Sequence, residues 1–226
     1  MFEHTHPYKP FIPEHTTKLI VGTLPPPRFT TGALKENDVD WCYGSRDGQL
    51  WPILNAMFQL NLSFETTQEA ITQRKKFLKK RHIGICDIVA SAKREKIDAS
   101  DMGMQEVVLR NLIEVLTENP LIDTLLFTGG NSKNGPEYFF RRLLKKHQIQ
   151  LKVLNNEVPR IHCFTLPISA EDKNTNVRII KTVSLTAPSG AANRAVGSLQ
   201  KYKDMKAANP EISTIDFRIA QYTPFF

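Results

Sequence analysis

Residues 183–194 read VSLTAPSGAANR, a short apolar strand that stops abruptly in a loop of Pro, Ser and Gly. A second stretch near the other end of the chain has the same design, since residues 18–27 read KLIVGTLPPP. In an open α/β sheet such loops follow the carboxyl ends of strands, where ligands bind. Two such loops, far apart in the sequence, therefore predict one shared site at the edge of a sheet.

Between these two stretches, segments rich in β-branched and apolar residues alternate with helical patterns. Apolar residues at helical spacing predict helices over residues 50–60 and 105–118. Pro136 predicts the start of another helix, because the missing N–H of proline costs nothing in a first turn. Strands that alternate with helices indicate an α/β fold with a mostly parallel sheet covered on both faces. The predicted strands span residues 18–23, 82–89, 122–128, 161–166 and 179–186.

The chain has 226 residues, of which 41% are hydrophobic, so it can bury a sizeable core. Nothing in the composition requires a split into two units, and we expect one domain over residues 1–226. Residues 1–17 are rich in Pro and His and are expected to form an extended N-terminal arm. The net charge of +7 favours a polyanionic partner, although many proteins are mildly basic.

The cysteines, the histidines and the apolar runs indicate the compartment of the protein and whether it binds a metal or a membrane. Cys42, Cys86 and Cys163 are widely separated, and their odd number leaves at least one thiol unpaired in a monomer, which favours a reducing compartment. His4 and His6 have no accompanying acidic cluster, so we expect no metal site. No apolar run reaches the ~18 residues of a membrane span, and the N-terminus has no signal-peptide pattern. We therefore expect a cytoplasmic monomer without membrane contact.

A third strand end opens into the helix predicted at Pro136, where residues 127–137 read FTGGNSKNGPE. Small residues in the loops at 22–29, 129–136 and 186–194 allow close approach of the backbone. The helix N-termini after the last two loops would offer unpaired N–H groups to an anion. A phosphate or a nucleobase suits such a site, although each loop alone could be an ordinary turn between a strand and a helix.

Residues 41–51, WCYGSRDGQLW, form a turn-prone stretch just before a predicted helix. Aromatic side chains in loops can stack on bases, and each such contact contributes about 1–3 kcal/mol. Trp51 begins the helical pattern and is expected in the core. Trp41 and Tyr43 could belong either to the core or to a base-binding surface.

Five short motifs occur in order along the chain: HPY at 6–8, GTLP at 22–25, YG to WPIL over 43–54, GICDIVASAKRE at 84–95 and PSGAAN at 188–193. In this order they resemble the uracil-DNA glycosylase superfamily, and most of all its hypoxanthine-DNA glycosylase branch. The resemblance spans nearly the whole chain. It implies a three-layer α/β/α sandwich around a short, mostly parallel sheet. It also implies an enzyme that flips a base out of DNA and hydrolyses its N-glycosidic bond with water, without a metal or an organic cofactor.

The resemblance also implies roles for the loops. The first loop would line the base pocket, and the loop at 186–194 would grip the DNA backbone beside the flipped nucleotide. The candidate base-pocket residues are Gly22, Thr23, Leu24, Pro25, Trp41, Tyr43 and Asn131. The candidate DNA-binding residues are Ser132, Lys133, Ser189, Gly190, Ala191, Asn193 and Arg194.

Two positions depart from the superfamily's pattern. Several branches carry Asp or Asn at the position of Leu24, and His or Asn at the position of Ala187; neither side chain here can activate water or stabilise a departing base. The hypoxanthine branch also has an apolar residue at the position of Leu24, and it carries its catalytic Asn in the stretch before a Phe-Trp pair, which here is residues 45–51. Ser45 and Gly48 occupy the positions where this Asn is expected, so Asp47, the nearest carboxylate, is the first catalytic candidate. Asp87 is the second candidate, and it could instead be a structural Asp that caps a turn.

Two functions fit these observations. The first is a DNA-repair glycosylase that acts on a deaminated or damaged base. The second is a catalytically silent member that keeps the pocket and binds nucleic acid, a free base or a nucleotide. A carboxylate or amide of Asp47, Asp87 or Asn131 that points into the pocket would favour the enzyme, whereas a pocket of apolar and backbone groups would favour binding alone.

Overall fold

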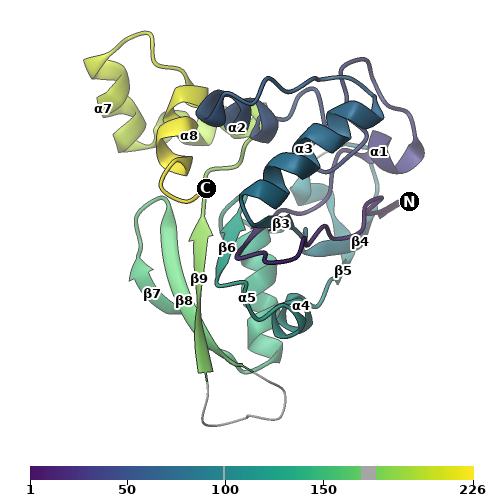
Figure 1. The fold of residues 1–226 in the computed structure, drawn as a ribbon, viewed down its shortest axis with the longest axis vertical. Coiled ribbons are helices and arrows are strands. Elements are labelled where there is room, and N and C mark those ends of the chain that lie inside the picture. Colours follow the sequence, from purple (N-terminus) through teal and green to yellow (C-terminus); the bar gives the residue numbers. More distant parts are fainter. Residues whose placement is uncertain (99, 169–176) are drawn as a thin grey trace.

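The computed structural model describes residues 1–98, 100–168 and 177–226, and its architecture is mixed α/β (Figure 1). The strands are β1 (Phe2–Thr5), β2 (Lys18–Val21), β3 (Ile83–Ile85), β4 (Val89–Arg94), β5 (Gln105–Leu109), β6 (Thr124–Phe127), β7 (Lys152–Asn155), β8 (Arg160–Pro167) and β9 (Val177–Ser184). The α-helices are α1 (Pro27–Thr31), α2 (Leu50–Phe58), α3 (Gln68–Lys80), α4 (Leu112–Glu118), α5 (Pro136–Lys146), α6 (Asn193–Ser198), α7 (Gln200–Ala208) and α8 (Thr214–Tyr222). Two short 3-10 helices are η1 (Asp101–Gly103) and η2 (Gly190–Ala192).

Six strands form the central sheet in the order β3-β2-β6-β9-β8-β7. The first four run parallel, whereas β8 is antiparallel to β9, and β7 is antiparallel to β8. Because parallel strands share one direction, the loops that follow β2, β6 and β9 emerge at the same edge of the sheet. A second, antiparallel sheet has the order β1-β4-β5.

Helices cover both faces of the central sheet, so the molecule has three layers (Figure 1). On one face, α2, α3 and α8 pack in a core that includes Ile20 and Leu126. On the other face, α4, α5 and the small sheet pack in a core that includes Leu125 and Ile180. Leu125 and Leu126 are adjacent in β6 and enter opposite cores, as the two-residue period of a strand requires.

The predicted alternation of strands and helices is confirmed. All five predicted strands are present, and the helix expected over residues 50–60 is α2. The helix expected over residues 105–118 is wrong in its first half, because residues 105–109 form β5 and pair with β4. The β-branched residues of this half suit a strand. Helix α4 starts only at Leu112, where the side chain of Asn111 accepts the backbone N–H of Glu114 and caps the helix.

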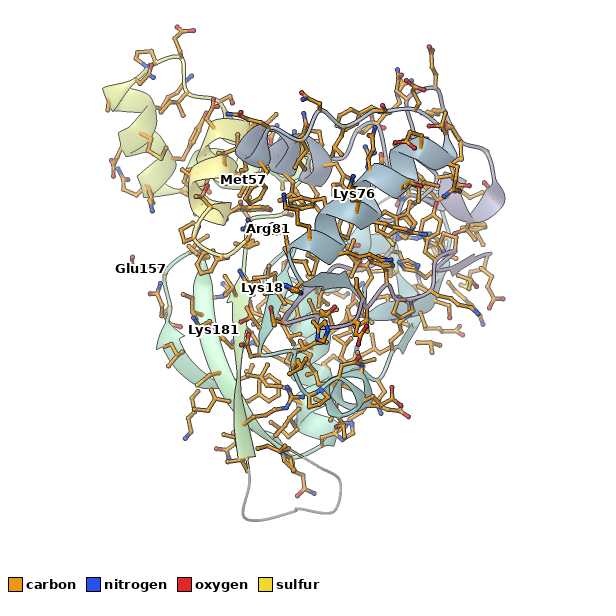
Figure 2. The ribbon with its side chains drawn as sticks, viewed as in Figure 1. Lys18, Met57, Lys76, Arg81, Glu157 and Lys181 are labelled. Carbon is orange, nitrogen blue, oxygen red and sulfur yellow. The ribbon has the colours of Figure 1, made fainter. Side chains whose placement is uncertain are left out.

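Both ends of the chain are attached to the rest of the structure. Strand β1 pairs along β4, so part of the expected N-terminal arm is a strand of the small sheet. At the other end, the side chain of Lys18 donates to the carbonyl oxygen of Phe225 at 2.7 Å, and Arg81 donates to that of Phe226 at 2.8 Å. Figure 2 labels both cations, and Figure 1 marks the C-terminus in the same view.

The two cores lead to a first prediction. Leu125→Ala and Leu126→Ala should each lower the free energy of unfolding by about 2–5 kcal/mol, because each change leaves a cavity in a fully buried site. Leu121→Ala is the matched control: Leu121 is 57% exposed, so its loss should cost about 0.5 kcal/mol or less. Urea titrations followed by circular dichroism measure all three. Equal effects of the buried and exposed substitutions would contradict the full burial of Leu125 and Leu126.

Candidate functional site

Two adjoining cavities lie at the carboxyl edge of the central sheet. Cavity 1 has a volume of about 390 Å³ and is bounded by the loops at 22–29 and 186–194. Cavity 2 has a volume of about 300 Å³ and borders the loop at 129–136. Both are lined by Thr23, Asp101, Thr128 and Ala187. The predicted convergence of the three loops is therefore confirmed, and the volumes match the roughly 300–1,000 Å³ of small-molecule sites.

A buried carboxylate, Asp87, forms part of the wall of cavity 1. Its Oδ1 accepts hydrogen bonds from the backbone N–H of Gly22 and from the hydroxyl of Tyr43, both at 2.6 Å. Its Oδ2 lies 3.0 Å from Nε2 of His6. Because Nδ1 of His6 accepts the backbone N–H of Tyr8, Nε2 carries the proton and donates to Asp87. One carboxylate thus joins three segments of the chain.

Tyr43 is held in an unusual backbone conformation. Its φ of 57° lies in the left-handed region, which a bulky residue rarely adopts. Its hydroxyl contacts Asp87 and also lies 3.3 Å from Oγ1 of Thr128. Burial, with the nearby charge of Asp87, raises the pKa of Tyr43 well above its usual value, so the hydroxyl remains a donor. These contacts fix the aromatic ring against cavity 1 and stabilise the strained backbone.

The loop before α2 is anchored by an arginine of α1. Nε and Nη2 of Arg28 donate to the two carboxylate oxygens of Asp38 at 2.7 and 2.8 Å, and Nη2 also reaches Oγ of Ser45 at 2.8 Å. Burial by itself would raise the pKa of Asp38, but hydrogen bonds from Arg28 and from backbone N–H groups lower it to about 2. The bidentate ion pair therefore persists at all pH values near neutrality.

A second arginine sets the shape of the loop at 186–194. Arg218 of α8 is fully buried. Its guanidinium donates to the carbonyl oxygens of Ala187 and Ser189 at 3.0 and 3.2 Å. It also donates to the side-chain oxygens of Asn193 and Gln49 at 2.8 and 2.9 Å, which ties the loop to the start of α2.

Asp101 opens η1 and reaches both cavities. Oγ1 of Thr23 donates to its Oδ1 at 2.8 Å, and the amide of Asn134 donates to its backbone carbonyl at 2.9 Å. Burial raises the pKa of Asp101 to about 6, although the hydrogen bond from Thr23 and the charge of Arg94 oppose this, while the charge of Asp87 adds to it. Asp101 is thus a carboxyl group in the cavity wall that titrates close to neutral pH.

The structure brings many of the sequence-predicted residues together and leaves others apart. Those that line cavity 1 are Thr23, Leu24, Pro25, Tyr43, Asp47, Asp87, Ser189, Gly190 and Ala191. Ser132 lines cavity 2. Asp47 lies at the rim, where its side chain is 68% exposed and 3.4 Å from Arg28.

Other predicted residues lie outside the cavities. Trp41 is buried in the core and stacks on Trp51 with 6.0 Å between ring centroids. Gly22 lines neither cavity and donates its N–H to Asp87, and the side chain of Asn193 is bonded to Arg218. Asn131, Lys133 and Arg194 are exposed and line neither cavity.

Among the residues of the site that sequence reasoning did not assign to it are His6, Tyr8, Asp101 and Thr128. Thr128 directly follows β6, so its position at a strand end could have identified it. Asp101 follows no strand of the central sheet, and only the packing of the small sheet brings η1 to the cavities. No local pattern in the sequence marks it.

The described residues contain no group of three or more His, Cys, Asp or Glu side chains placed to hold a metal ion. Within the same ranges, no helix has the length and apolar character needed to cross a membrane.

The fold and the cavities define a class: a three-layer α/β/α protein whose site lies at the carboxyl ends of parallel strands. No protein-family model and no curated protein matches the sequence. Among solved structures, the chain is similar to the solution NMR structure of a candidate uracil DNA glycosylase from Methanosarcina acetivorans. The two chains share 15% sequence identity with a TM-score of 0.52, and the match covers 96% of this chain and 99% of the other. The fold is therefore of the uracil-DNA glycosylase type.

The crowding around Gly22 leads to a second prediction. A Cβ at this position would lie 2.3 Å from the hydroxyl oxygen of Tyr43 and 2.9 Å from Oδ1 of Asp87. Gly22→Ala should therefore displace Tyr43 and lower the free energy of unfolding by about 1–3 kcal/mol. Gly190→Ala is the control, because a Cβ there meets nothing within 4 Å. Chemical denaturation measures both, and a neutral Gly22→Ala would show that the Tyr43–Asp87 contact is not rigid.

Proposed function

We propose that the chain is a DNA glycosylase that hydrolyses the N-glycosidic bond of a flipped deaminated or damaged base. The supporting observation is cavity 1, which lies at the ligand-binding edge of a uracil-DNA glycosylase-like fold and combines apolar walls with three carboxyl groups, those of Asp47, Asp87 and Asp101. A flipped base needs a confined pocket. Hydrolysis through an oxocarbenium-like sugar also needs a carboxylate or amide that orients water.

The residues that line cavity 1 have two different roles. Leu24 and Pro25 supply apolar surface and Tyr43 an aromatic ring, against which a base can pack. Asp87 fixes the ring of Tyr43 and the backbone of Gly22, so contacts within the protein itself set the shape of this surface. A preformed pocket loses little conformational entropy when it binds, and it selects bases by shape.

Three exposed cations, which we call the basic surface, lie within a few residues of positions that line cavity 2. Arg194 is exposed at the start of α6, directly after the loop at 188–191 that lines cavity 1. Lys201 and Lys203 are exposed on α7, which projects at the upper left of Figure 1. Cations at the mouth of a pocket can bind the phosphates that flank a flipped nucleotide. We assign this surface to the DNA backbone.

A second function is favoured by one observation. Leu24 and Ala187 both line cavity 1, and neither offers a polar side chain. Gly22, Tyr43 and His6 also engage both carboxylate oxygens of Asp87 in hydrogen bonds, which leaves this carboxylate less able to accept a proton from water. A protein that binds nucleic acid, a free base or a nucleotide without cutting it would have the same pocket.

The central test measures base excision directly. Excess protein is incubated with labelled oligonucleotides that carry one uracil, hypoxanthine, xanthine or mismatched thymine, and alkali then cleaves each abasic site. We expect excision of at least one of these bases and none from the undamaged oligonucleotide of the same sequence. Binding to the same oligonucleotides without any cleavage would contradict the glycosylase and support the binding protein.

The basic surface leads to a separate prediction. Arg194→Ala should weaken DNA binding without changing base preference, because phosphate contacts carry no sequence information. The loss of one phosphate contact should reduce the slope of log K against log salt by about 0.9 on duplex DNA. Lys146→Ala, at the far end of α5, removes the same charge and should leave the slope unchanged. Fluorescence anisotropy across a salt series measures both, and equal slopes for the two variants would remove Arg194 from the interface.

A further inference from the structure

The three carboxyl groups of cavity 1 differ in how many of their acceptor sites are free. The side chain of Asp87 is 7% exposed, and its two oxygens are engaged by Gly22, Tyr43 and His6. Asp47 is largely solvated and pairs with Arg28 at the rim. Within the described ranges, Asp101 accepts one side-chain hydrogen bond, at Oδ1 from Thr23, and its Oδ2 accepts none. Asp101 is therefore the carboxyl group with an acceptor oxygen available inside the wall.

Asp101 also lies at the junction of the two cavities, since it is the carboxyl group that lines both. A flipped nucleotide presents its base to one compartment and its sugar and phosphates to the next, so the glycosidic bond lies between them. The group that directs water at this bond has to stand at the boundary. Asp47 and Asp87 line cavity 1 but not cavity 2.

The surroundings hold Asp101 in one position. The amide of Asn134 bonds the backbone carbonyls of both Asp101 and Met104, at 2.9 and 3.0 Å, and so clamps η1 to the loop after β6. Arg94 is buried beside it, with Nε bonded to His4 at 2.8 Å and Nη1 bonded to the carbonyl oxygen of Ser100 at 2.5 Å. A fixed carboxylate needs no rearrangement when it takes up a proton.

We propose that Asp101, rather than Asp47 or Asp87, is the general base of the reaction. Its carboxylate accepts a proton from the water whose oxygen bonds to the anomeric carbon of the sugar. The carbon–nitrogen bond breaks, its electron pair leaves with the base, and the base takes up a proton as Asp101 releases its own to solvent. This assignment rests on the proposed glycosylase function.

The acidity of the group suits this role. Burial raises the pKa of Asp101 to about 6, so the carboxylate is mostly ionised at pH 7 and remains a stronger base than an exposed Asp. A general base works best when its pKa lies near the working pH. Positively charged Arg94 and the hydroxyl of Thr23 keep the pKa from rising further.

The pH dependence of excision tests the assignment. With subsaturating DNA, the excision rate constant of the wild type should fall about tenfold per pH unit below pH 6, because the rate constant under these conditions reports the essential base of the free protein. We call this fall in the rate constant the acid limb of the pH profile. Asp101→Asn should lower this rate constant about 10²–10⁴-fold and abolish the acid limb, while DNA affinity stays within a few-fold. Asp98→Asn is the matched control: Asp98 lies 3.6 Å from the same Arg94 and lines neither cavity, so its acid limb and rate should match the wild type.

Thr23 supplies a finer test on the same profile. Thr23→Val removes the hydroxyl that lowers the pKa of Asp101, so the acid limb should move to higher pH. Thr23→Ser keeps the hydroxyl and should return the limb to its original position. A purely structural role for Asp101 predicts lower activity without a shifted limb.

Thermal melting measures the same group without any reaction. The pKa of Asp101 is higher in the folded protein, about 6, than the ~3.9 of an unfolded chain, so stability is lost as the pH rises between these values. Asp101→Asn should therefore melt above the wild type at pH 7.5 and together with it at pH 3.5. Identical melting temperatures at both pH values would contradict the raised pKa of Asp101.

The outcomes separate the two proposals. If the wild type excises a base and Asp101→Asn keeps its rate or its acid limb, the assignment of Asp101 is overturned and the glycosylase stands. Asp47→Asn and Asp87→Asn in the same assay then identify which carboxylate replaces it. If the wild type excises none of the four bases, the glycosylase itself fails, and the role of Asp101 falls with it.

Discussion

The buried carboxylate of Asp87 is the contact on which the site depends. A charge removed from water is costly unless hydrogen bonds replace its hydration, and Asp87 obtains these from Gly22, Tyr43 and His6. The three groups belong to the end of β2, the loop before α2 and the segment after β1. If any of these segments moved, part of the buried charge would lose its partner. The same contact explains why residue 22 is a glycine, since Tyr43 and Asp87 occupy the space of a side chain.

Arginines stabilise the loops as Asp87 stabilises the cavity wall. The partly buried Arg28 and the buried Arg94 and Arg218 each hold irregular backbone or a loop carboxylate near the cavities. Loops expose carbonyl groups that no strand or helix satisfies, and a guanidinium offers five N–H donors in a rigid plane. Part of the positive charge of this chain therefore serves its own structure. The net charge of +7 is correspondingly weaker evidence for a nucleic-acid partner than the exposed cations at Arg194 and on α7.

Cavity 1 also shows how one residue type takes different roles in one site. Asp87 is engaged by three partners and organises the wall, whereas Asp47 is solvated and pairs at the rim. Asp101 is half-buried with a free acceptor oxygen, and desolvation of its carboxyl group raises its pKa to about 6. The three aspartates have the same side chain, and their roles differ because their solvation and hydrogen bonding differ. A similar fold at 15% sequence identity does not show which of the three aspartates has which role.

The sequence by itself determined the alternation of strands and helices, the parallel sheet and the convergence of three loops, because these follow from local periodicity and from strand ends that share one edge. The helix predicted from the sequence was wrong over residues 105–109, where the apolar spacing fits a helix but pairing with β4 forms a strand. Only the tertiary structure decided that Trp41 enters the core, that Asn131 stays outside the cavities and that Asp101 enters the site. Burial and the number of hydrogen-bond partners are sums over segments distant in the chain, and no local pattern carries them.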